Sequence, residues 1–564
     1  MQVVLNFIKV AVVLCLITIT FNCAGIQSPS GGPPDTTPPK IINTYPAPRT
    51  LNYHDNKFSF SFDKYIDRRT LQESFFVSPS LGELEFNWDG KDVEISFTDS
   101  LRINTTYIVT IGTDVVDTRK NRMAESFSLP FSTGETIDSA SIAGVVIDDK
   151  PTGVMIFAYQ LDKRNPDTLN PSRVKPDYLT QTGKDGTFLL PYLAYGKYRL
   201  IAVRDEYKNL FYDVQTDQYG VCNDDINLIY QVPKFTGVQF RMTEDDTTAP
   251  FLSSARTIDD SHVLLRFSET MYPTDIDSVI IVDTLTNTQL KMRDFSFDVS
   301  SRLDAQLVTD QQEVGRIYRV TLFGFKDFHG NAMRVPTNRA DFNGSSTSDT
   351  SRPTFEIKGF GNNAKNISID DTIRFVFSEA IRIKSFESGF SLKDSSKKKI
   401  EGIFKWQDSR EFFFFPTFLL ALGMQYNISL IMDSLIDYSG NSYKDSTFTT
   451  RFQTVEEKML SSISGIVSDE VKDAKGKIYL TAVNAAKKEI KPKVQIIDSV
   501  GHFKFDHLIE GKYILSGFLD ADSSGVYNFG KPFPYQPAER FVIYPDTLKL
   551  RARWPLEGVS IRFK

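Results

Sequence analysis

The chain has 564 residues, far more than a single hydrophobic core accommodates, so we expect several domains. Apolar residues make up 41% and aromatic residues 13% of the sequence, which excludes a disordered chain and favours β structure. The net charge of −6 and the pI of about 5.6 leave no basic surface for nucleic acid.

The first feature in chain order is an apolar stretch, residues 10–21, that ends just before Cys23. It is shorter than the roughly 20 residues that span a bilayer, and residues 24–40 are rich in Gly, Pro and Ser. This arrangement resembles a bacterial lipoprotein signal, although Thr20 and Asn22 depart from the usual lipobox. The resemblance implies a signal peptide at 1–22 and a lipid on Cys23, followed by a flexible tether to residue 37. The alternative is a soluble secreted protein in which Cys23 is incidental.

One sequence pattern then occurs three times. A strand ends in a turn with a charged residue, and a Tyr-led alternating strand and an Asp-x-x-x-Asn turn follow. The charged residues are Lys64 (after Asp63), Glu269 and Glu379, and the last turns are Asp117–Asn121, Asp327–Asn331 and Asp437–Asn441. With the opening Thr37-Pro-Pro-Lys-Ile41, the pattern resembles the bacterial Ig-like domain of S-layer and other cell-surface proteins. The resemblance implies β-sandwich domains at 38–134, 248–343 and 352–454.

A second pattern occurs twice. The segment beginning at Ser141 (Ser-Ile-Ala-Gly-Val-Val) matches the segment beginning at Ser462 (Ser-Ile-Ser-Gly-Ile-Val), and each copy continues with Gly-x-Phe and Leu-x-x-Gly-x-Tyr. These motifs resemble the carboxypeptidase-regulatory-like, or prealbumin-like, domain, which implies two further β-sandwiches at 138–245 and 458–564. A Ser-rich linker at 344–351 separates the second and third Ig-like domains.

The expected fold class is therefore all-β, with tandem sandwich domains behind a lipoprotein signal. The segment from Ser28 to Pro39, Ser-Pro-Ser-Gly-Gly-Pro-Pro-Asp-Thr-Thr-Pro-Pro, completes a resemblance to exported Ig-like lipoproteins of Bacteroidota. Most members of that class have no assigned activity.

Motifs of catalysis are missing from the sequence: there is no Gly-x-Ser-x-Gly, no His-Glu-x-x-His and no phosphate-binding Gly loop. Cys222 has no cysteine left to pair with after processing, and we interpret it as a small hydrophobic residue. Trp88 and Trp406 recur at one internal position, which indicates core packing rather than a glycan platform. We expect no enzyme activity and no cofactor.

The best candidate for a metal site is the loop Asp520–Asn528, in which Asp520, Asp522, Ser524 and Asn528 have the spacing of a calcium loop. Lys531 stands where such a loop needs a bidentate Glu, so we expect calcium binding that is weak or absent and interpret the loop as a structural turn. The residues Asp63, Glu269, Glu379 and the Asp-x-x-x-Asn pairs also allow a metal site, but we interpret them as side-chain locks of turns.

These observations lead to a non-catalytic lipoprotein anchored in the outer membrane, a structural scaffold or protein-binding arm of a cell-envelope complex. Its expected partners are the membrane, through the N-terminal lipid, and envelope proteins, but not nucleic acid. Two alternatives remain open, a surface glycan-binding lipoprotein and an accessory subunit of an envelope enzyme. The sequence leaves both the periplasmic and the surface-facing orientation open.

Overall fold

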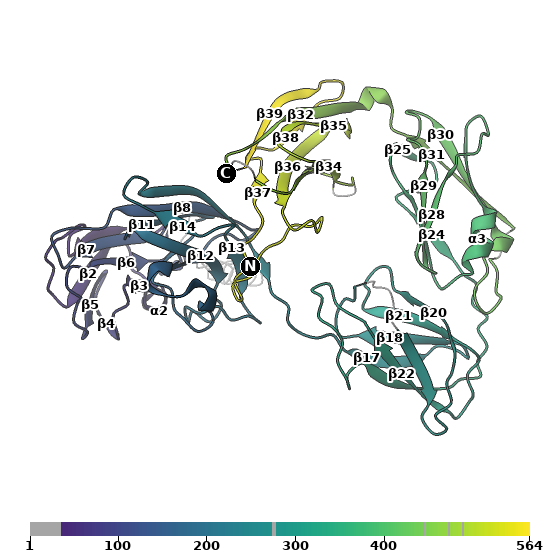
Figure 1. Ribbon diagram of the computed structural model, residues 1–564, viewed down its shortest axis with the longest axis horizontal. Coiled ribbons are helices and arrows are strands. Elements are labelled where there is room, and N and C mark those ends of the chain that lie inside the picture. The colour runs from purple at the N-terminus through teal and green to yellow at the C-terminus, as the bar shows by residue number, and fades with distance from the viewer. Residues whose placement is uncertain (1–34, 273–277, 444–445, 472–473, 488–489, 564) are drawn as a thin grey trace, which may run out of the picture. The chain divides into compact units, whose positions relative to one another are not determined.

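The structure is a computed structural model, which describes residues 35–272, 278–443, 446–471, 474–487 and 490–563. We call the five predicted sandwich segments modules 1 to 5, at 38–134, 138–245, 248–343, 352–454 and 458–564. In the described residues, strands dominate, and each module contributes its own pair of sheets (Figure 1). The expected all-β fold class is confirmed.

Module 1 pairs the sheet β1-β2-β5-β4 with the sheet β3-β6-β7. In β2 every second residue is buried, because Phe58, Phe60 and Phe62 point into the core while the residues between them face outward. The short helix α2 (Arg68–Glu73) follows β2. The strands are β1 (Ile41–Tyr45), β2 (Lys57–Phe62), β3 (Phe75–Ser78), β4 (Leu84–Asp89), β5 (Asp92–Phe97), β6 (Thr106–Ile111) and β7 (Phe127–Ser132).

Module 3 repeats this arrangement, with the sheets β17-β18-β21-β20 and β19-β22-β23. Its core is built by alternate residues such as Val263, Leu265 and Phe267 of β18. The strands are β17 (Leu252–Thr257), β18 (His262–Phe267), β19 (Ser278–Asp283), β20 (Met292–Phe297), β21 (Asp304–Thr309), β22 (Ile317–Phe323) and β23 (Arg339–Asn343).

Module 4 has the sheets β24-β26-β29-β28 and β25-β31-β30-β27. A helix, α3 (Ile383–Gly389), lies where module 1 has α2, and its Phe386 packs in the core against Phe375 and Phe412. The strands are β24 (Phe355–Lys358), β25 (Ala364–Ile367), β26 (Ile373–Phe377), β27 (Phe390–Asp394), β28 (Gly402–Asp408), β29 (Glu411–Pro416), β30 (Gln425–Ile431) and β31 (Thr447–Thr454), and the 3-10 turn η3 (Met432–Ser434) follows β30.

Modules 2 and 5 share a different topology. In module 2 the central strand β8 pairs with β11 and, in parallel, with β15, and in module 5 β32 pairs in the same way with β35 and β39. The parallel neighbour explains one glycine of the repeated motif, because a Cβ on Gly144 would lie 2.2 Å from the Val238 carbonyl oxygen and one on Gly465 would lie 1.8 Å from that of Val559.

The second sheet of module 2 contains β9, β12, β13 and β16 in that order, with β14 also on β12, and that of module 5 has the order β34-β33-β36-β37, with β38 also on β36. The elements of module 2 are β8 (Ala140–Ile147), β9 (Met155–Gln160), η1 (Leu161–Lys163), η2 (Pro166–Thr168), β10 (Tyr178–Gln181), β11 (Thr187–Leu193), β12 (Gly196–Arg204), β13 (Gln218–Val221), β14 (Ile226–Leu228), β15 (Lys234–Arg241) and β16 (Thr243–Glu244). Those of module 5 are η4 (Glu457–Met459), β32 (Leu460–Asp469), β33 (Lys477–Asn484), β34 (Lys493–Ile497), β35 (Gly501–Ile509), β36 (Gly511–Asp520), β37 (Phe541–Ile543), β38 (Leu548–Leu550) and β39 (Leu556–Phe563).

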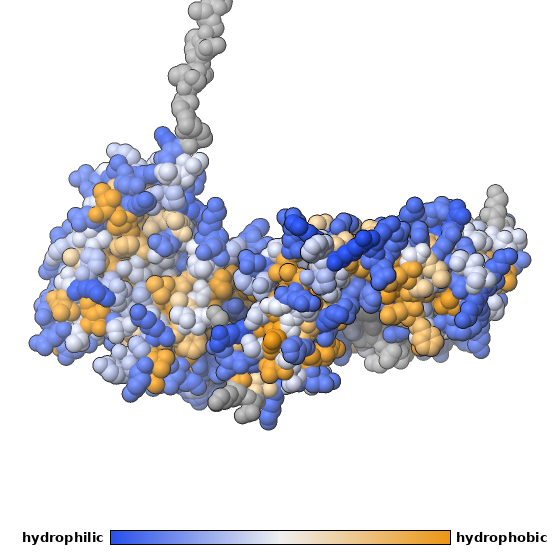
Figure 2. Space-filling model, turned by 90° about the horizontal axis from the view of Figure 1, so that it is seen from above, coloured by the Kyte–Doolittle hydropathy of each residue, from blue (hydrophilic) through white to orange (hydrophobic). Residues whose placement is uncertain are grey.

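The chain divides into two compact units, of which the first contains module 1 with Thr180–Lys184 and the second contains the other modules. On the face drawn in Figure 2, hydrophobic residues form small patches separated by hydrophilic ones. Among the described residues, no helix combines the length and the apolar character needed to cross a membrane. The predicted signal peptide and Cys23 lie outside the described residues.

Candidate functional site

Modules 1, 3 and 4 share one polar cluster at the point where the chain enters the sandwich. It combines an Asp from the preceding segment, the charged residue of the turn after the second long strand, and the Asp of the Asp-x-x-x-Asn turn. The members are Asp35, Lys64 and Asp117 in module 1; Asp246, Glu269 and Asp327 in module 3; and Asp349, Glu379 and Asp437 in module 4.

The Asp-x-x-x-Asn turns are held by their own side chains. In module 4 the Asp437 carboxylate accepts the backbone N–H of Asn441 at 2.8 Å and its side-chain amide at 2.9 Å, and that amide also reaches the backbone oxygen of Asp349 at 3.3 Å. The corresponding Asn amides of modules 1 and 3 bond the backbone oxygens of Asp35 and Asp246. The interpretation of these pairs as turn locks is confirmed, and the Asn also fixes the incoming segment.

In module 1 the cluster contains its own cation. The Lys64 ammonium lies 2.7 Å from the Asp35 carboxylate and 3.5 Å from that of Asp117. The hydrogen bond from Lys64 holds the pKa of Asp35 well below its usual range, and Asp35 in turn raises the pKa of Lys64. This cluster is therefore neutralised by the chain itself.

In module 4 the same position is occupied by Glu379, and the three side chains are all acidic. One carboxylate oxygen from each of Asp349, Glu379 and Asp437 lies within 4.8 Å of the others. Burial, together with the charges of Asp349 and Asp437, raises the pKa of Glu379 to about 7. Glu379 forms no hydrogen bond among the described residues, so its interpretation as a turn lock is wrong.

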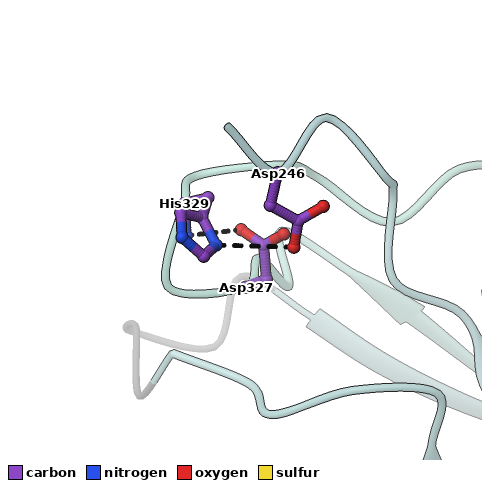
Figure 3. A group of neighbouring side chains, drawn as sticks. All are labelled: Asp246, Asp327 and His329. Carbon is purple, nitrogen blue, oxygen red and sulfur yellow. Dashed lines mark hydrogen bonds and ion pairs between the residues drawn. The ribbon is translucent and has the colours of Figure 1, made fainter. Parts of the chain in front are cut away.

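The cluster of module 3 contains a histidine as well (Figure 3). The Asp327 carboxylate accepts the backbone N–H of His329 at 2.8 Å, and the Nδ1 atom of His329 lies 3.4 Å from the Asp246 carboxylate. Burial, together with the charges of Asp246 and Asp327, raises the pKa of Glu269 to about 7. Glu269 is only partly buried, so this cluster is more open to water than that of module 4.

A second histidine of module 3, His262, lies beside the acidic cluster of module 4. His262 is 1% exposed, its Nδ1 atom lies 2.9 Å from the Asp259 carboxylate, and its Nε2 atom has no partner among the described residues. Ligand atoms of Asp259, His262 and Asp349 lie within 4.8 Å of one another. Burial lowers the pKa of His262, but the Asp259 carboxylate outweighs burial and the net shift is upward.

Modules 3 and 4 also meet around a partly buried acid, Asp294 of β20. Its carboxylate accepts hydrogen bonds from the hydroxyl of Ser409 and, at 3.3 Å, from that of Tyr438. Burial raises the pKa of Asp294 to about 6 and also raises the pKa of Asp408 beside it. This contact therefore places two acids with raised pKa values between the modules.

The predicted calcium loop of module 5 brings its acids together and adds one that the sequence analysis missed. Carboxylate oxygens of Asp520, Asp522 and Glu539 lie within 4.8 Å of one another. Each accepts backbone N–H groups: Asp520 from Ser524 and Gly525, Asp522 from Ser524, and Glu539 from Ala521 and Asn528. The Asn528 side chain donates to Asp522 and its oxygen accepts from Gly530, so it also acts within the turn. That the loop is a structural turn with weak or absent calcium binding remains a prediction.

The residues between Asp520 and Glu539 form an arm that lies on module 2. The Tyr219 hydroxyl donates to the Gly530 carbonyl oxygen at 3.0 Å, and the Ala538 N–H donates to the Cys222 carbonyl oxygen at 3.2 Å. The Arg199 guanidinium, which is paired with Asp225, lies 3.5 Å from the centre of the Tyr535 ring. Asp520 and Glu539 thus lie at the two ends of an arm of module 5 that contacts module 2, which is far away in the sequence.

The other candidate residues are placed as follows. Cys222 is buried, and burial raises the pKa of its thiol, so it fits the prediction of a small hydrophobic residue. Trp88 and Trp406 are partly buried against the cores of their modules, as predicted. The third tryptophan, Trp554, is 74% exposed in a turn between β38 and β39, and no sequence pattern singled it out.

Comparisons with known proteins identify the Ig-like modules. Residues 35–133 and 349–454 match the family described as bacterial Ig-like domain, so modules 1 and 4 are bacterial Ig-like domains. No curated protein matches the chain. For modules 2, 3 and 5 the family assignment stays a prediction, while the structure gives each of them a pair of sheets.

Similar solved structures include an S-layer protein, an L,D-transpeptidase and an alpha-2-macroglobulin, all at low identity. The N-terminal part of the bacterial S-layer protein SbsC is 17% identical with a TM-score of 0.17, and the match covers 36% of this chain and 44% of that one. An L,D-transpeptidase of Mycobacterium tuberculosis is 10% identical with a TM-score of 0.16, covering 35% and 90%. Alpha-2-macroglobulin of E. coli is 8% identical with a TM-score of 0.14, covering 90% and 34%.

Proposed function

We propose that this chain is a non-catalytic lipoprotein of the outer membrane that serves as a structural scaffold or protein-binding arm of a cell-envelope complex. Its bacterial Ig-like domains are of the kind found in surface proteins, which is compatible with a structural or binding role. The lipid on Cys23 and the location follow from the sequence pattern alone, and both the periplasmic and the surface-facing orientation stay open.

The observation that carries the proposal is the contact between the arm of module 5 and module 2. A chain that serves only as a flexible spacer needs no contact between modules that two other modules separate in sequence. Here the Tyr219–Gly530 hydrogen bond and the stacking of Arg199 on Tyr535 connect such modules. A scaffold needs fixed relations between its modules, and these contacts supply one of them.

The test is purification of the tagged protein from detergent-solubilised membranes under conditions that keep complexes intact. We expect it to elute with envelope proteins in fixed stoichiometry, and we expect Tyr535→Ala, which loosens the arm, to reduce their recovery. A control substitution on the exposed surface, Glu401→Gln, whose side chain is 74% exposed, should leave recovery unchanged. Elution of the native protein as a single chain would argue against a scaffold.

One observation favours the glycan-binding alternative. Trp554 exposes 74% of its surface in the turn before β39, and exposed aromatic rings are suited to stacking on sugars. In that case soluble glycans should quench the tryptophan fluorescence of the native protein, and Trp554→Ala should abolish the response. Unchanged fluorescence across a glycan panel would remove this alternative.

A further inference from the structure

The acidic cluster of module 4 draws its three carboxylates from three separate segments. Asp349 lies in the linker before the module, Glu379 in the turn after β26, and Asp437 in the turn after η3. Their closest oxygens lie within 4.8 Å of one another. Oxygens that coordinate one calcium ion at about 2.3–2.6 Å can be separated by up to about 5 Å, so a single ion can contact all three.

Glu379 gives a separate indication that a partner is missing. The residue is 8% exposed, and among the described residues its side chain has neither a hydrogen bond nor an ion pair. Within the same part of the chain, no lysine or arginine pairs with Asp349 or Asp437. A charged carboxylate without a partner is unfavourable at a site shielded from water, and a cation at this position would relieve that.

Module 1 has a cation at the position that corresponds to Glu379. Its cluster has the same two Asp residues and the same Asn contact, but Lys64 stands in place of Glu379 and its ammonium reaches both carboxylates. Exchanging Lys for Glu changes the formal charge of the cluster from −1 to −3. At the position that module 1 fills with Lys64, module 4 has an acid, and the cationic group beside it is His262 of module 3, which lies with Asp259 at Asp349.

We propose that Asp349, Glu379 and Asp437 bind a calcium ion that fastens the linker to module 4. Carboxylate oxygens from flexible loops suit Ca²⁺, whereas Mg²⁺ requires stricter octahedral geometry and Zn²⁺ favours nitrogen and sulfur ligands. Asp349 also lines a cavity of about 280 Å³, which gives the cluster a route to solvent. The equivalent cluster of module 3 does not carry the same inference, because Glu269 is only partly buried.

The ion would act at the junction of two modules. Asp349 lies close to Asp259 and His262 of module 3, and the Asp260 N–H donates to the linker carbonyl of Thr347 at 2.8 Å. Fixing Asp349 to module 4 therefore also restricts module 3. This inference requires neither the lipid on Cys23 nor the envelope role, and its test uses the purified protein alone.

The test is calorimetric titration of CaCl₂ into the mature chain, purified in detergent and stripped with a chelator. We expect Glu379→Gln and Glu379→Lys each to bind one ion fewer per chain than the native protein. The matched control is Glu401→Gln, an exposed glutamate of the same module, which should bind the native number. Equal numbers of bound ions in all four proteins would overturn the proposal.

Thermal unfolding is a second measurement. It gives a different result if Glu379 has a purely structural role than if it binds calcium. In chelator we expect both Glu379 variants to be at least as stable as the native protein, because each removes a buried unpaired charge. In calcium we expect a smaller increase in Tm for the variants than for the native protein. Variants that are less stable than the native protein in chelator would mean that Glu379 has a protein partner, and the calcium site would be wrong.

Discussion

The contact between modules 3 and 4 should respond to pH through Asp294. The carboxylate of Asp294 lies between the hydroxyls of Ser409 and Tyr438. Burial at this position raises its pKa from 3.8 to about 6. When the modules separate, the carboxylate regains water and its ordinary pKa. An acid whose pKa is raised in the closed state favours that state while it is protonated, so the contact weakens as pH rises through about 6.

The size of the effect follows from the two pKa values. Between about pH 5 and pH 7.5 the ratio of closed to open contacts should fall about tenfold, which is about 1.4 kcal/mol. Asp294→Asn removes this proton linkage, and the amide can still bond the Ser409 and Tyr438 hydroxyls. Asp408 is shifted in the same direction, so we expect the variant to retain part of the native pH dependence.

Hydrogen exchange of the two edge strands β20 and β28, corrected for the chemical exchange rate, measures the opening. The measurement is made in chelator, so that cation binding does not contribute. The native chain should exchange faster at about pH 7.5 than at about pH 5, with a smaller difference in Asp294→Asn. Glu313→Gln, on a side chain that is 68% exposed in module 3, should behave as the native chain. Identical pH dependence in the native chain and Asp294→Asn would refute the assignment of the proton to Asp294.

Three further predictions concern the anchor and module 5. Cys23→Ala should release the protein from membranes into the soluble fraction, and a variant that still pellets after a high-salt wash contradicts lipid anchoring. Tyr535→Ala removes the ring under Arg199, so labelling of the buried Cys222 thiol should be faster by on the order of tenfold; unchanged labelling would show that the arm does not protect it. Asp520→Ala removes the acceptor of two backbone N–H groups, so it should lower the stability of module 5 by about 1–3 kcal/mol, equally in calcium and in chelator. A loss of stability that is seen only in calcium would make the loop a calcium site.

The features that the sequence predicts well are those encoded locally. Alternating apolar residues define strands such as β2, and the Asp and Asn of each Asp-x-x-x-Asn turn bond one another within four residues. The repeated Gly of the second motif was recognised as a pattern, but its reason appears only in the structure. Gly144 and Gly465 lie under the backbone of a parallel strand that comes from the far end of the module.

The features that the sequence could not supply depend on residues that are distant along the chain. Glu539 joins Asp520 across the whole arm, Asp349 joins Glu379 from a linker that looked merely flexible, and Tyr219 meets Gly530 from another module. The spacing within a motif does not predict these long-range contacts, because they depend on how the sandwiches and their loops pack. The Asp520 loop has the spacing of a metal-binding motif, yet its carboxylates already have backbone partners. The cluster of Glu379 has no such spacing, and within the described residues Glu379 itself has no hydrogen bond, although Asp437 beside it does.

Modules 1, 3 and 4 show how one side chain changes the chemistry of a repeated junction. The fold brings the same Asp, turn residue and Asp together in each copy, so the backbone geometry does not distinguish them. What differs is the sign of the turn residue: Lys64 makes the junction of module 1 self-neutralising, while Glu379 leaves that of module 4 with three negative charges. The first junction is held at any calcium concentration. The second depends on its surroundings, so the same architectural contact becomes sensitive to the ions of the compartment in which the protein works.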